Sequence, residues 1–344
     1  MVHGVILFGL AGSGHAQSWI HPKAAKLPFD HMGPFVTLGD GSVLAASADH
    51  ALISKDDSKT WEQYPLFEDP TRFLARDERA LLRTRDGVVV MVFLNEREIT
   101  RGKFVLDDPK ALSEFHLPTY VIRSLDDGKT WEKPQKIQDG WCGAIRCLIQ
   151  LENGRLVLAG QQLVFDPGRH VVLTYVSDDD GKTWQSSNII DLGGRGSHDG
   201  AMEATLAELS DGRVWMLIRT ILGRFWQAFS EDGGSSWRVI RPSDIEASSS
   251  PGVLERLESG RLVLLWNRFA EGRPRNLGRR EELSMAFSED DGKTWTQPVV
   301  IARDPGKRQS YPYVYERRPG ELWITTMQGF VRIGLREADF VKVQ

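Results

Sequence analysis

Apolar segments along the chain alternate with short polar turns at the spacing of paired β-strands. In six places a run of mostly apolar residues leads into a tight turn that contains glycine and continues into a second apolar run. This pattern is typical of antiparallel hairpins. The six predicted hairpins cover residues 35–46, 80–93, 147–159, 205–218, 253–266 and 314–325.

A second repeated element follows each of the first five hairpins. It is an octapeptide that begins with Ser, carries Asp at its third position and ends with Trp. The copies occupy residues 54–61, 124–131, 177–184, 230–237 and 288–295. Their Trp residues lie 70, 53, 53 and 58 positions apart, about the length of one four-stranded sheet with its loops. Asp and Gly suit a tight turn, and the Trp can pack between sheets.

Together these repeats predict an all-β fold, a six-bladed β-propeller of four-stranded antiparallel blades. The sixth blade lacks an octapeptide, so we expect its outer strands from residues 329–335 and, near the N-terminus, from residues 19–29. A propeller whose termini share a blade leaves no sheet edge unpaired. Helical spacing is almost absent, and only residues 109–115 could hold a turn or two. We expect residues 17–344 to form a single domain.

The acidic octapeptides could also be read as calcium loops. An EF-hand loop needs six ligands at fixed spacing and a closing Glu, and none of the five copies has that pattern. We therefore interpret them as structural turns and expect neither a metal nor an organic cofactor.

Composition narrows the classes of partner. The 344 residues are 41% hydrophobic and 26% charged, enough to bury a large core. The formal net charge of −4 leaves no basic surplus for nucleic acid or an anionic membrane, and we expect no membrane span and a monomer. Cys142 and Cys147 are too few for a disulfide framework or a zinc site. We expect plain thiols, with one local bridge as the alternative.

The N-terminus begins with an apolar run over residues 2–12, which leads to Gly14, His15 and Ala16. A short apolar run followed by small residues predicts a signal peptide over residues 1–16, and hence a secreted or periplasmic protein. The run lacks a preceding Lys or Arg, so a buried first strand is the alternative.

The octapeptides match the Asp-box, S-x-D-x-G-x-[TS]-W, and on this motif the chain resembles the sialidase superfamily. The resemblance implies the propeller fold and an exo-glycosidase acting on terminal sialic acid or a related acidic sugar. Because the same box occurs in propellers with other tasks, a propeller that binds glycans or proteins without cleaving them is an alternative.

Geometry alone gives a first set of candidate site residues. The first strand of each propeller blade lines the axis, so residues just before each hairpin can meet at one mouth. Ionisable and phenolic groups collect at these positions. They are His31, Arg79, Arg146, His198, Asp199, Glu203, Arg280, Tyr311 and Tyr313.

Glu203 and Arg219 stand at the two ends of one hairpin, sixteen residues apart. The chain returns beside its starting point, so both side chains can reach the same mouth. The resemblance implies that Glu203 is the base that activates a tyrosine and that Arg219 grips the substrate carboxylate. A purely structural ion pair is the alternative.

Tyr311 lies near the start of the segment 310–315, where the resemblance places the nucleophile of sialidases. The anomeric carbon of a sialic acid bears a carboxylate that would repel an Asp or Glu nucleophile, whereas a neutral phenol beside a Glu is not repelled. Tyr313 and Tyr315 point the same way by strand alternation and are rival phenols. Aromatic packing is the alternative for all three.

Residues 267–282 carry five arginines, and the resemblance implies a further carboxylate-binding arginine there. Arg280 fits best and Arg279 second, because a planar guanidinium can pair with a carboxylate through two hydrogen bonds. We expect most of the five to lie on a solvated rim.

The first blade departs from the family pattern. Sialidases carry Arg-Ile-Pro where this chain has His31, Met32, Gly33 and Pro34, so the first substrate-binding arginine is missing. The loss should weaken carboxylate binding by about 1.5–3 kcal/mol. Arg79 or Arg146 from a neighbouring blade, or a protonated His31, could replace that charge.

The family's acid/base aspartate corresponds to Asp49, which could equally be a turn residue. With the first arginine gone, a glycosidase or lyase for a different sugar is a further alternative.

Overall fold

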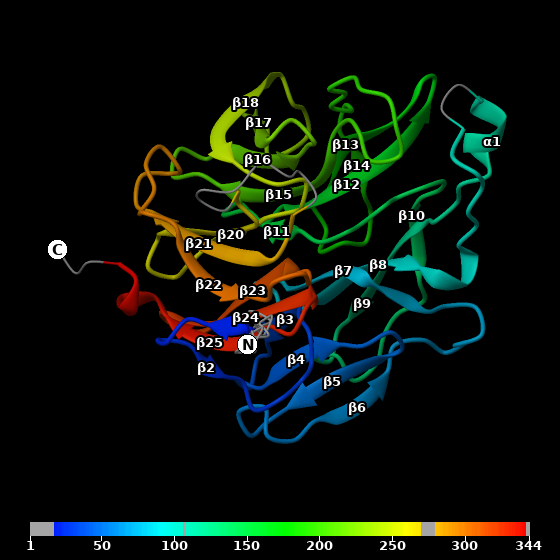
Figure 1. The fold of residues 1–344 in the computed structure, drawn as a ribbon. Helices are drawn as coiled ribbons and strands as arrows, with labels where there is room; N and C mark the ends of the chain where they lie inside the picture. Colours follow the sequence, from blue (N-terminus) through cyan, green and yellow to red (C-terminus); the bar gives the residue numbers. More distant parts are fainter. Residues whose placement is uncertain (1–16, 106–107, 270–278, 342–344) are drawn as a thin grey trace, which may run out of the picture.

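The computed structural model describes residues 17–105, 108–269 and 279–341 and contains six antiparallel sheets arranged around a common centre (Figure 1). The predicted six-bladed propeller is therefore confirmed. The predicted signal peptide, residues 1–16, lies outside the described residues.

The strands follow one another in chain order from the axis outward. Blade 1 contains β3 (Phe35–Thr37), β4 (Val43–Ala46), β5 (His50–Ser54) and β6 (Glu62–Pro65). Blade 2 contains β7 (Ala75–Arg83), β8 (Val89–Asn95), β9 (Thr119–Ser124) and β10 (Gln135–Gln138). Blade 3 contains β11 (Leu148–Gln150), β12 (Leu156–Phe165), β13 (Gly168–Ser177) and β14 (Gln185–Ser186).

The second half of the ring follows the same order. Blade 4 contains β15 (Met202–Glu208), β16 (Val214–Arg219), β17 (Arg224–Ser230) and β18 (Val239–Glu246). Blade 5 contains β19 (Val253–Arg256), β20 (Leu262–Trp266), β21 (Glu282–Ser288) and β22 (Val299–Arg303), with β1 (Trp19–Ile20) beside β22. Blade 6 contains β23 (Ser310–Arg318), β24 (Glu321–Gln328), β25 (Arg332–Arg336) and β2 (Ala25–Lys26).

The ring closes through its innermost strands and its N-terminus. The strands β3, β7, β11, β15, β19 and β23 contact one another in turn, and β23 contacts β3. The N-terminal β2 pairs with β25, as the sequence predicts for the sixth blade. The segment predicted as one N-terminal strand is divided, because β1 pairs with β22 and adds a fifth strand to blade 5.

Apolar side chains fill the spaces between the blades. The described residues form six buried clusters, and each cluster joins two neighbouring blades. In strand β8 all seven residues are buried, and the first six, residues 89–94, are apolar. A strand covered on both faces is apolar along its whole length instead of alternating.

The octapeptides form turns that press against the preceding blade. In the second copy, Ser124 Oγ accepts a hydrogen bond from Gly128 N at 2.8 Å, and Asp126 Oδ1 accepts one from Thr130 N at 2.9 Å. Gly128 has φ +85°, and a Cβ there would lie 2.1 Å from Leu44 Cδ1 of blade 1. The glycine is required both by the backbone and by this close approach.

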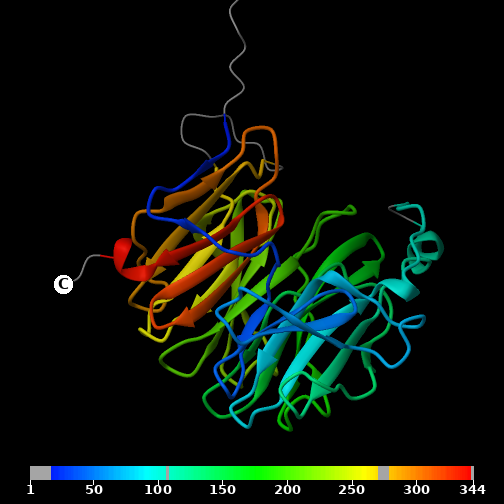
Figure 2. The same cartoon turned by 90° about the horizontal axis from the view of Figure 1, so that it is seen from below.

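Helical structure is short, as predicted. The helix α1 (Pro109–Ser113) lies at the outer edge of the molecule (Figures 1 and 2), and two 3₁₀ turns, η1 (Glu96–Glu98) and η2 (Glu337–Asp339), complete the set among the described residues. None of the described helices has the length and apolar character needed to cross a membrane.

The described part of the chain contains neither a disulfide bond nor a group of side chains that could hold a metal ion. Cys142 and Cys147 are free, buried thiols, in agreement with the prediction. Burial raises the pKa of Cys142 to about 11 and that of Cys147 to about 12, so both stay protonated. Across the described ranges, no three His, Cys, Asp or Glu side chains gather in a way that could hold a metal ion.

Candidate active site

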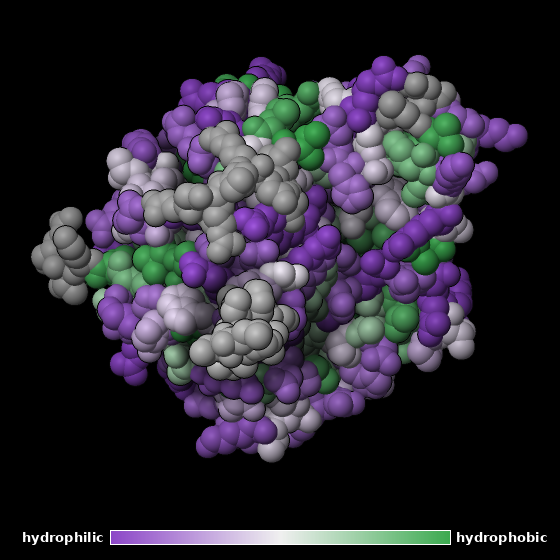
Figure 3. Space-filling model, viewed as in Figure 1, coloured by the Kyte–Doolittle hydropathy of each residue, from purple (hydrophilic) through white to green (hydrophobic). Residues whose placement is uncertain are grey.

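A cavity of about 490 Å³ lies at the propeller axis, where the first strands of several blades begin. Glu203, Arg219, Arg280 and Tyr311 line it together with Arg308. Glu203 and Arg219 come from blade 4, Arg280 from the segment before β21 in blade 5, and Tyr311 from blade 6. Hydrophilic residues dominate the surface around the centre of the propeller (Figure 3). Four candidates from three blades therefore meet at one cavity.

Glu203, Tyr311 and Arg219 form a closed set of hydrogen bonds. Tyr311 Oη donates to Glu203 Oε1 at 2.8 Å, and Arg219 Nη1 donates to Glu203 Oε2 at 2.5 Å. Arg219 Nη1 also lies 3.3 Å from Tyr311 Oη. Arg219 is 3% exposed and Tyr311 8%, so little water competes for these contacts.

The local backbone turns Glu203 and Tyr311 toward this cavity. Between β15 and β16, Met202 pairs with Arg219 and Thr205 with Leu217, so β15 contains one extra residue in a β-bulge. Glu203 lies within the bulge at φ +42°, and Tyr311 has φ +58°. Such positive values cost a non-glycine residue about 1–3 kcal/mol and cluster at functional sites.

Glu203 and Tyr311 differ in protonation at neutral pH. Burial and the neighbouring carboxylate of Glu203 raise the pKa of Tyr311 to about 12. Burial alone would raise the pKa of Glu203, but the adjacent Arg219 guanidinium outweighs it and holds the pKa of Glu203 below its ordinary value. At neutral pH the site therefore pairs a neutral phenol with a carboxylate that can accept its proton.

Two guanidinium groups are fixed around Ser249. Arg219 Nε and Nη2 each donate to Ser249 Oγ at 3.2 Å, and Arg280 Nη2 donates to Ser249 O at 2.6 Å. Arg280 Nη1 lies 3.4 Å from Gln328 Oε1. With its cations held in place, the cavity is prepared for an anionic group.

Comparisons with known proteins agree with this architecture. Residues 104–324, well over half of the chain, match the profile of the BNR repeat-like domain. The chain belongs to the BNR repeat-like family. A sialidase of Vibrio cholerae is 26% identical to this BNR-repeat propeller over 172 residues, which is 43% of the chain and 22% of the Vibrio protein. The match therefore spans about a fifth of that relative.

Solved structures of other proteins share the fold of this BNR-repeat propeller. A Hadza microbial sialidase superposes with a TM-score of 0.65 and 16% identity, over 89% of this chain and 65% of that one. An α-L-arabinanase of Penicillium chrysogenum superposes with a TM-score of 0.59 and 14% identity, over 95% and 100%. The protein is a BNR-repeat propeller of the sialidase superfamily, and its relatives include glycoside hydrolases.

Two predicted residues of blade 1 are not brought to the cavity of the BNR-repeat propeller. The His31 ring lies 5.0 Å from the Trp61 ring and 6.4 Å from that of Phe29, between blades 6 and 1. Burial lowers the pKa of His31, which opposes a role as a cation. Asp49 Oδ1 lies 2.8 Å from His50 Nδ1, and this hydrogen bond lowers the pKa of Asp49. A general acid needs a raised pKa instead.

Asp199 and Arg79 also lie outside the cavity lining. The Asp199 carboxylate accepts hydrogen bonds from Arg195 N at 2.9 Å and Gly200 N at 2.7 Å, and so orders its own loop. Arg79 is 3% exposed and donates to Arg76 O at 3.0 Å. His198, by contrast, lines the cavity.

Tyr313 and Tyr315 turn away from the cavity. Tyr313 Oη donates to the backbone carbonyls of Asp77 at 3.0 Å and Arg79 at 3.1 Å. Tyr315 Oη lies 2.5 Å from Thr37 Oγ1. Of the three rival phenols, Tyr311 alone contacts Glu203 among the described residues.

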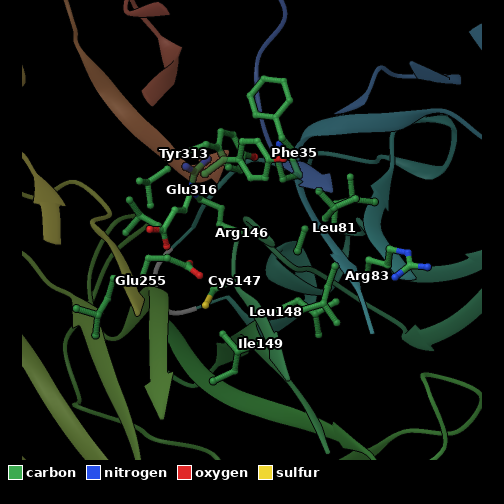
Figure 4. Close-up of a pocket in the computed structure, with 18 of the residues that line it drawn as sticks. Phe35, Leu81, Arg83, Arg146, Cys147, Leu148, Ile149, Glu255, Tyr313 and Glu316 are labelled. Carbon is green, nitrogen blue, oxygen red and sulfur yellow. The ribbon is translucent and has the colours of Figure 1, made fainter. Parts of the chain in front are cut away.

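Arg146 lines a second cavity, of about 290 Å³, together with residues of the innermost strands (Figure 4). Its guanidinium lies 5.1 Å from the ring centre of Tyr311 and 4.3 Å from that of Tyr313. Glu255 and Glu316 line the second cavity. Burial and the neighbouring Glu316 raise the pKa of Glu255 to about 7.

Within the arginine-rich segment, Arg279 pairs with Glu281 at 3.6 Å and does not line the cavity. Arg273 and Arg275 lie outside the described residues. Arg308, in the loop between β22 and β23, lines the cavity and was missed by the sequence analysis, because a loop arginine carries no periodic signal.

An aromatic side of the cavity was also missed. The rings of Phe104 and Phe115 lie 6.1 Å apart, those of Phe115 and Trp141 lie 5.3 Å apart, and all three residues line the cavity. Phe104 and Phe115 belong to the long connection between β8 and β9. The spacing of 70 instead of 53 residues between the first two octapeptides is the signal that marks this insertion.

Proposed function

We propose that this BNR-repeat propeller is a retaining exo-glycosidase that removes terminal sialic acid or a related acidic sugar. The observation that carries the proposal is the hydrogen-bonded set of Glu203, Tyr311 and Arg219 in the axial cavity. A phenol that faces a carboxylate and two fixed guanidiniums suits attack on a carbon that bears a carboxylate.

In the proposed first step, Tyr311 Oη attacks the anomeric carbon while Glu203 Oε1 takes the phenol proton. The bond between the anomeric carbon and the leaving oxygen breaks, and the sugar becomes covalently attached to Tyr311. Water then attacks the same carbon and releases one proton to the solvent, which balances the proton that the leaving oxygen takes up, and Glu203 returns its own proton to the phenolate as it leaves. Two displacements at one centre retain its configuration.

Arg219 and Arg280 would bind the substrate carboxylate. Each can donate charge-assisted hydrogen bonds from a guanidinium that the protein already holds in place. Arg308 would supply the third cation in place of the first-blade arginine that this chain lacks, because it lines the same cavity.

Apart from Glu203, the described residues that line the cavity include no carboxyl group that could give a proton to the leaving oxygen. A fluorogenic aryl sialoside avoids this requirement, since its phenolic leaving group departs without a general acid. Such a substrate therefore tests the nucleophile pair separately from the acid.

The test compares wild type with Tyr311→Phe and Glu203→Gln. Both changes should lower kcat by about 10²–10⁴-fold, because they remove the nucleophile or its base. Tyr315→Phe is the matched control, since that phenol contacts Thr37 instead of Glu203, and it should retain wild-type kcat. Full activity in Tyr311→Phe or Glu203→Gln rules out this mechanism.

A glycosidase for a different sugar is the second candidate. It is favoured by His31, which stands where sialidases carry their first arginine and packs against Phe29 and Trp61. This position therefore gives the substrate no cation. A panel of aryl sialoside, glucuronide and arabinofuranoside separates the two candidates by rate. Binding of these sugars without turnover would instead indicate a non-catalytic propeller.

A further inference from the structure

Beside Glu203, two largely buried polar side chains that also line the axial cavity, Gln161 and His170, form a line of hydrogen bonds. Gln161 Oε1 accepts from the backbone N–H of Glu203 at 2.9 Å, and Gln161 Nε2 lies 3.0 Å from His170 Nδ1. His170 Nε2 lies 2.9 Å from Ser197 O. Gln161 is 3% and His170 7% exposed, so water cannot readily replace a lost partner.

The chemistry of these groups fixes the protonation state of His170. A backbone N–H only donates, so Gln161 must turn its oxygen toward Glu203 and its NH₂ toward His170. His170 Nδ1 must then accept, and the ring proton resides on Nε2, where the Ser197 carbonyl accepts it. The line of hydrogen bonds is complete only with a neutral imidazole.

This line supports a strained part of the chain. Glu203 has φ +42° and lies in the β-bulge of β15, where the regular pairing with β16 is interrupted. Strained conformations persist only where the surroundings hold them. Gly143 leaves space for the Gln161 amide, because a Cβ at position 143 would lie 2.6 Å from Gln161 Nε2.

We propose that Gln161 and His170 are positioning residues for Glu203, and that they hold it only while the His170 imidazole is neutral. This inference rests on the proposed role of Glu203 as the base. Protonation of Nδ1 would set an N–H against the Gln161 NH₂. If the amide rotated to relieve that contact, its NH₂ would face the N–H of Glu203, so one of the two hydrogen bonds is lost in either case.

The surroundings of His170 keep it neutral near pH 7. Burial lowers the pKa of His170 below its ordinary value of 6.5. Among the facing charged groups, His198 and Arg219 lower the pKa further, whereas Glu203 and the hydrogen bond to Ser197 O raise it. The hold on Glu203 should therefore weaken as the pH falls below 6.5.

Kinetics provide the first test. Gln161→Leu removes both contacts at similar size and should lower kcat on the aryl sialoside by about 10–100-fold, with KM within about twofold. His170→Asn keeps an oxygen acceptor near the position of Nδ1 but cannot be protonated, so the acid-side fall of kcat should move to lower pH. His21→Asn is the control, because His21 packs against Phe340 away from the cavity, and its acid-side fall should match that of wild type.

Nitrogen-15 spectra of the imidazole provide a test that needs no turnover. They should show His170 protonated at Nε2 at pH 7 and titrating below 6.5. Three results would each overturn the positioning role of Gln161 and His170. They are a His170 ring protonated at Nδ1 at pH 7, a wild-type kcat in Gln161→Leu, and an acid-side fall of kcat in His170→Asn at the same pH as in wild type. A wild-type protein without turnover would overturn the proposed function alone, because the spectra still decide the state of His170.

Discussion

Replacing Glu255 with glutamine should stabilise the protein at alkaline pH and have little effect in acid. Glu255 projects into the second axial cavity beside Glu316 (Figure 4), and its pKa rises from the ordinary value of 4.5 to about 7. Folding therefore favours the protonated carboxyl. The carboxyl has a pKa of 4.5 in the unfolded chain and about 7 in the folded protein. As the pH rises between these two values, the folded state must either keep the proton or bury a charge, so the folded protein loses stability relative to the unfolded chain.

The size of this effect follows from the shift in pKa. At about 1.4 kcal/mol per unit, the native state loses about 3 kcal/mol at pH 8 and less than about 1 kcal/mol at pH 5. An unfolding entropy of about 2.1 cal/mol/K per residue converts about 3 kcal/mol into a Tm increase of about 4 °C for a chain of this length.

Thermal unfolding of wild type and Glu255→Gln at pH 5 and pH 8 measures the difference. Glu258→Gln is the matched control, because Glu258 is exposed on the same blade, and it should leave Tm unchanged at both pH values. A Tm difference between Glu255→Gln and wild type that is equal at pH 5 and pH 8, or a destabilised variant at pH 8, would show that Glu255 does not cause this loss of stability.

Three further predictions concern the fold and the cavity. Gly128→Ala should lower stability by more than Gly41→Ala. Both glycines have φ near +85°, but of the two only Gly128 has a neighbour, Leu44, within 4 Å of the added Cβ. Denaturant unfolding of the two variants measures the difference, and equal losses of stability would contradict a role for this contact between blades. Arg280→Lys should raise KM for an acidic sugar about tenfold with a smaller change in kcat, since a lysine lacks the planar fork; an unchanged KM would remove Arg280 from the substrate site. His31→Ala should lower Tm without changing KM, because His31 packs against Trp61 and Phe29; a raised KM would place it in the site after all.

The fold was largely predictable because its signals are local and repeated. Each octapeptide forms its turn through hydrogen bonds among its own residues, as between Asp126 and Thr130, and each hairpin carries its own turn residues. The division of the N-terminal segment was not predictable. Two-residue strands such as β1 and β2 have no period, and the edges of two blades were equally available to them.

The candidate site was predictable where blade geometry and the family motif agree on a position. Glu203, Arg219, Arg280 and Tyr311 meet at the cavity as expected, whereas Asp49 and His31 turn to local partners. The support of Glu203 by Gln161 could not be read from the sequence, because it joins residues 42 positions apart across two blades. Nothing in the alternation of β12 distinguishes Gln161 from its neighbour Gln162.

The residue that carries the sugar in the covalent intermediate can be identified directly. A fluorinated sialosyl analogue with a good leaving group should form a sugar–enzyme adduct that hydrolyses slowly, and mass spectrometry of its peptides would locate the attached sugar. We expect one sugar on Tyr311 in wild type and none in Tyr311→Phe. An adduct on another residue, or turnover of the aryl sialoside by Tyr311→Phe at the wild-type rate, would contradict it.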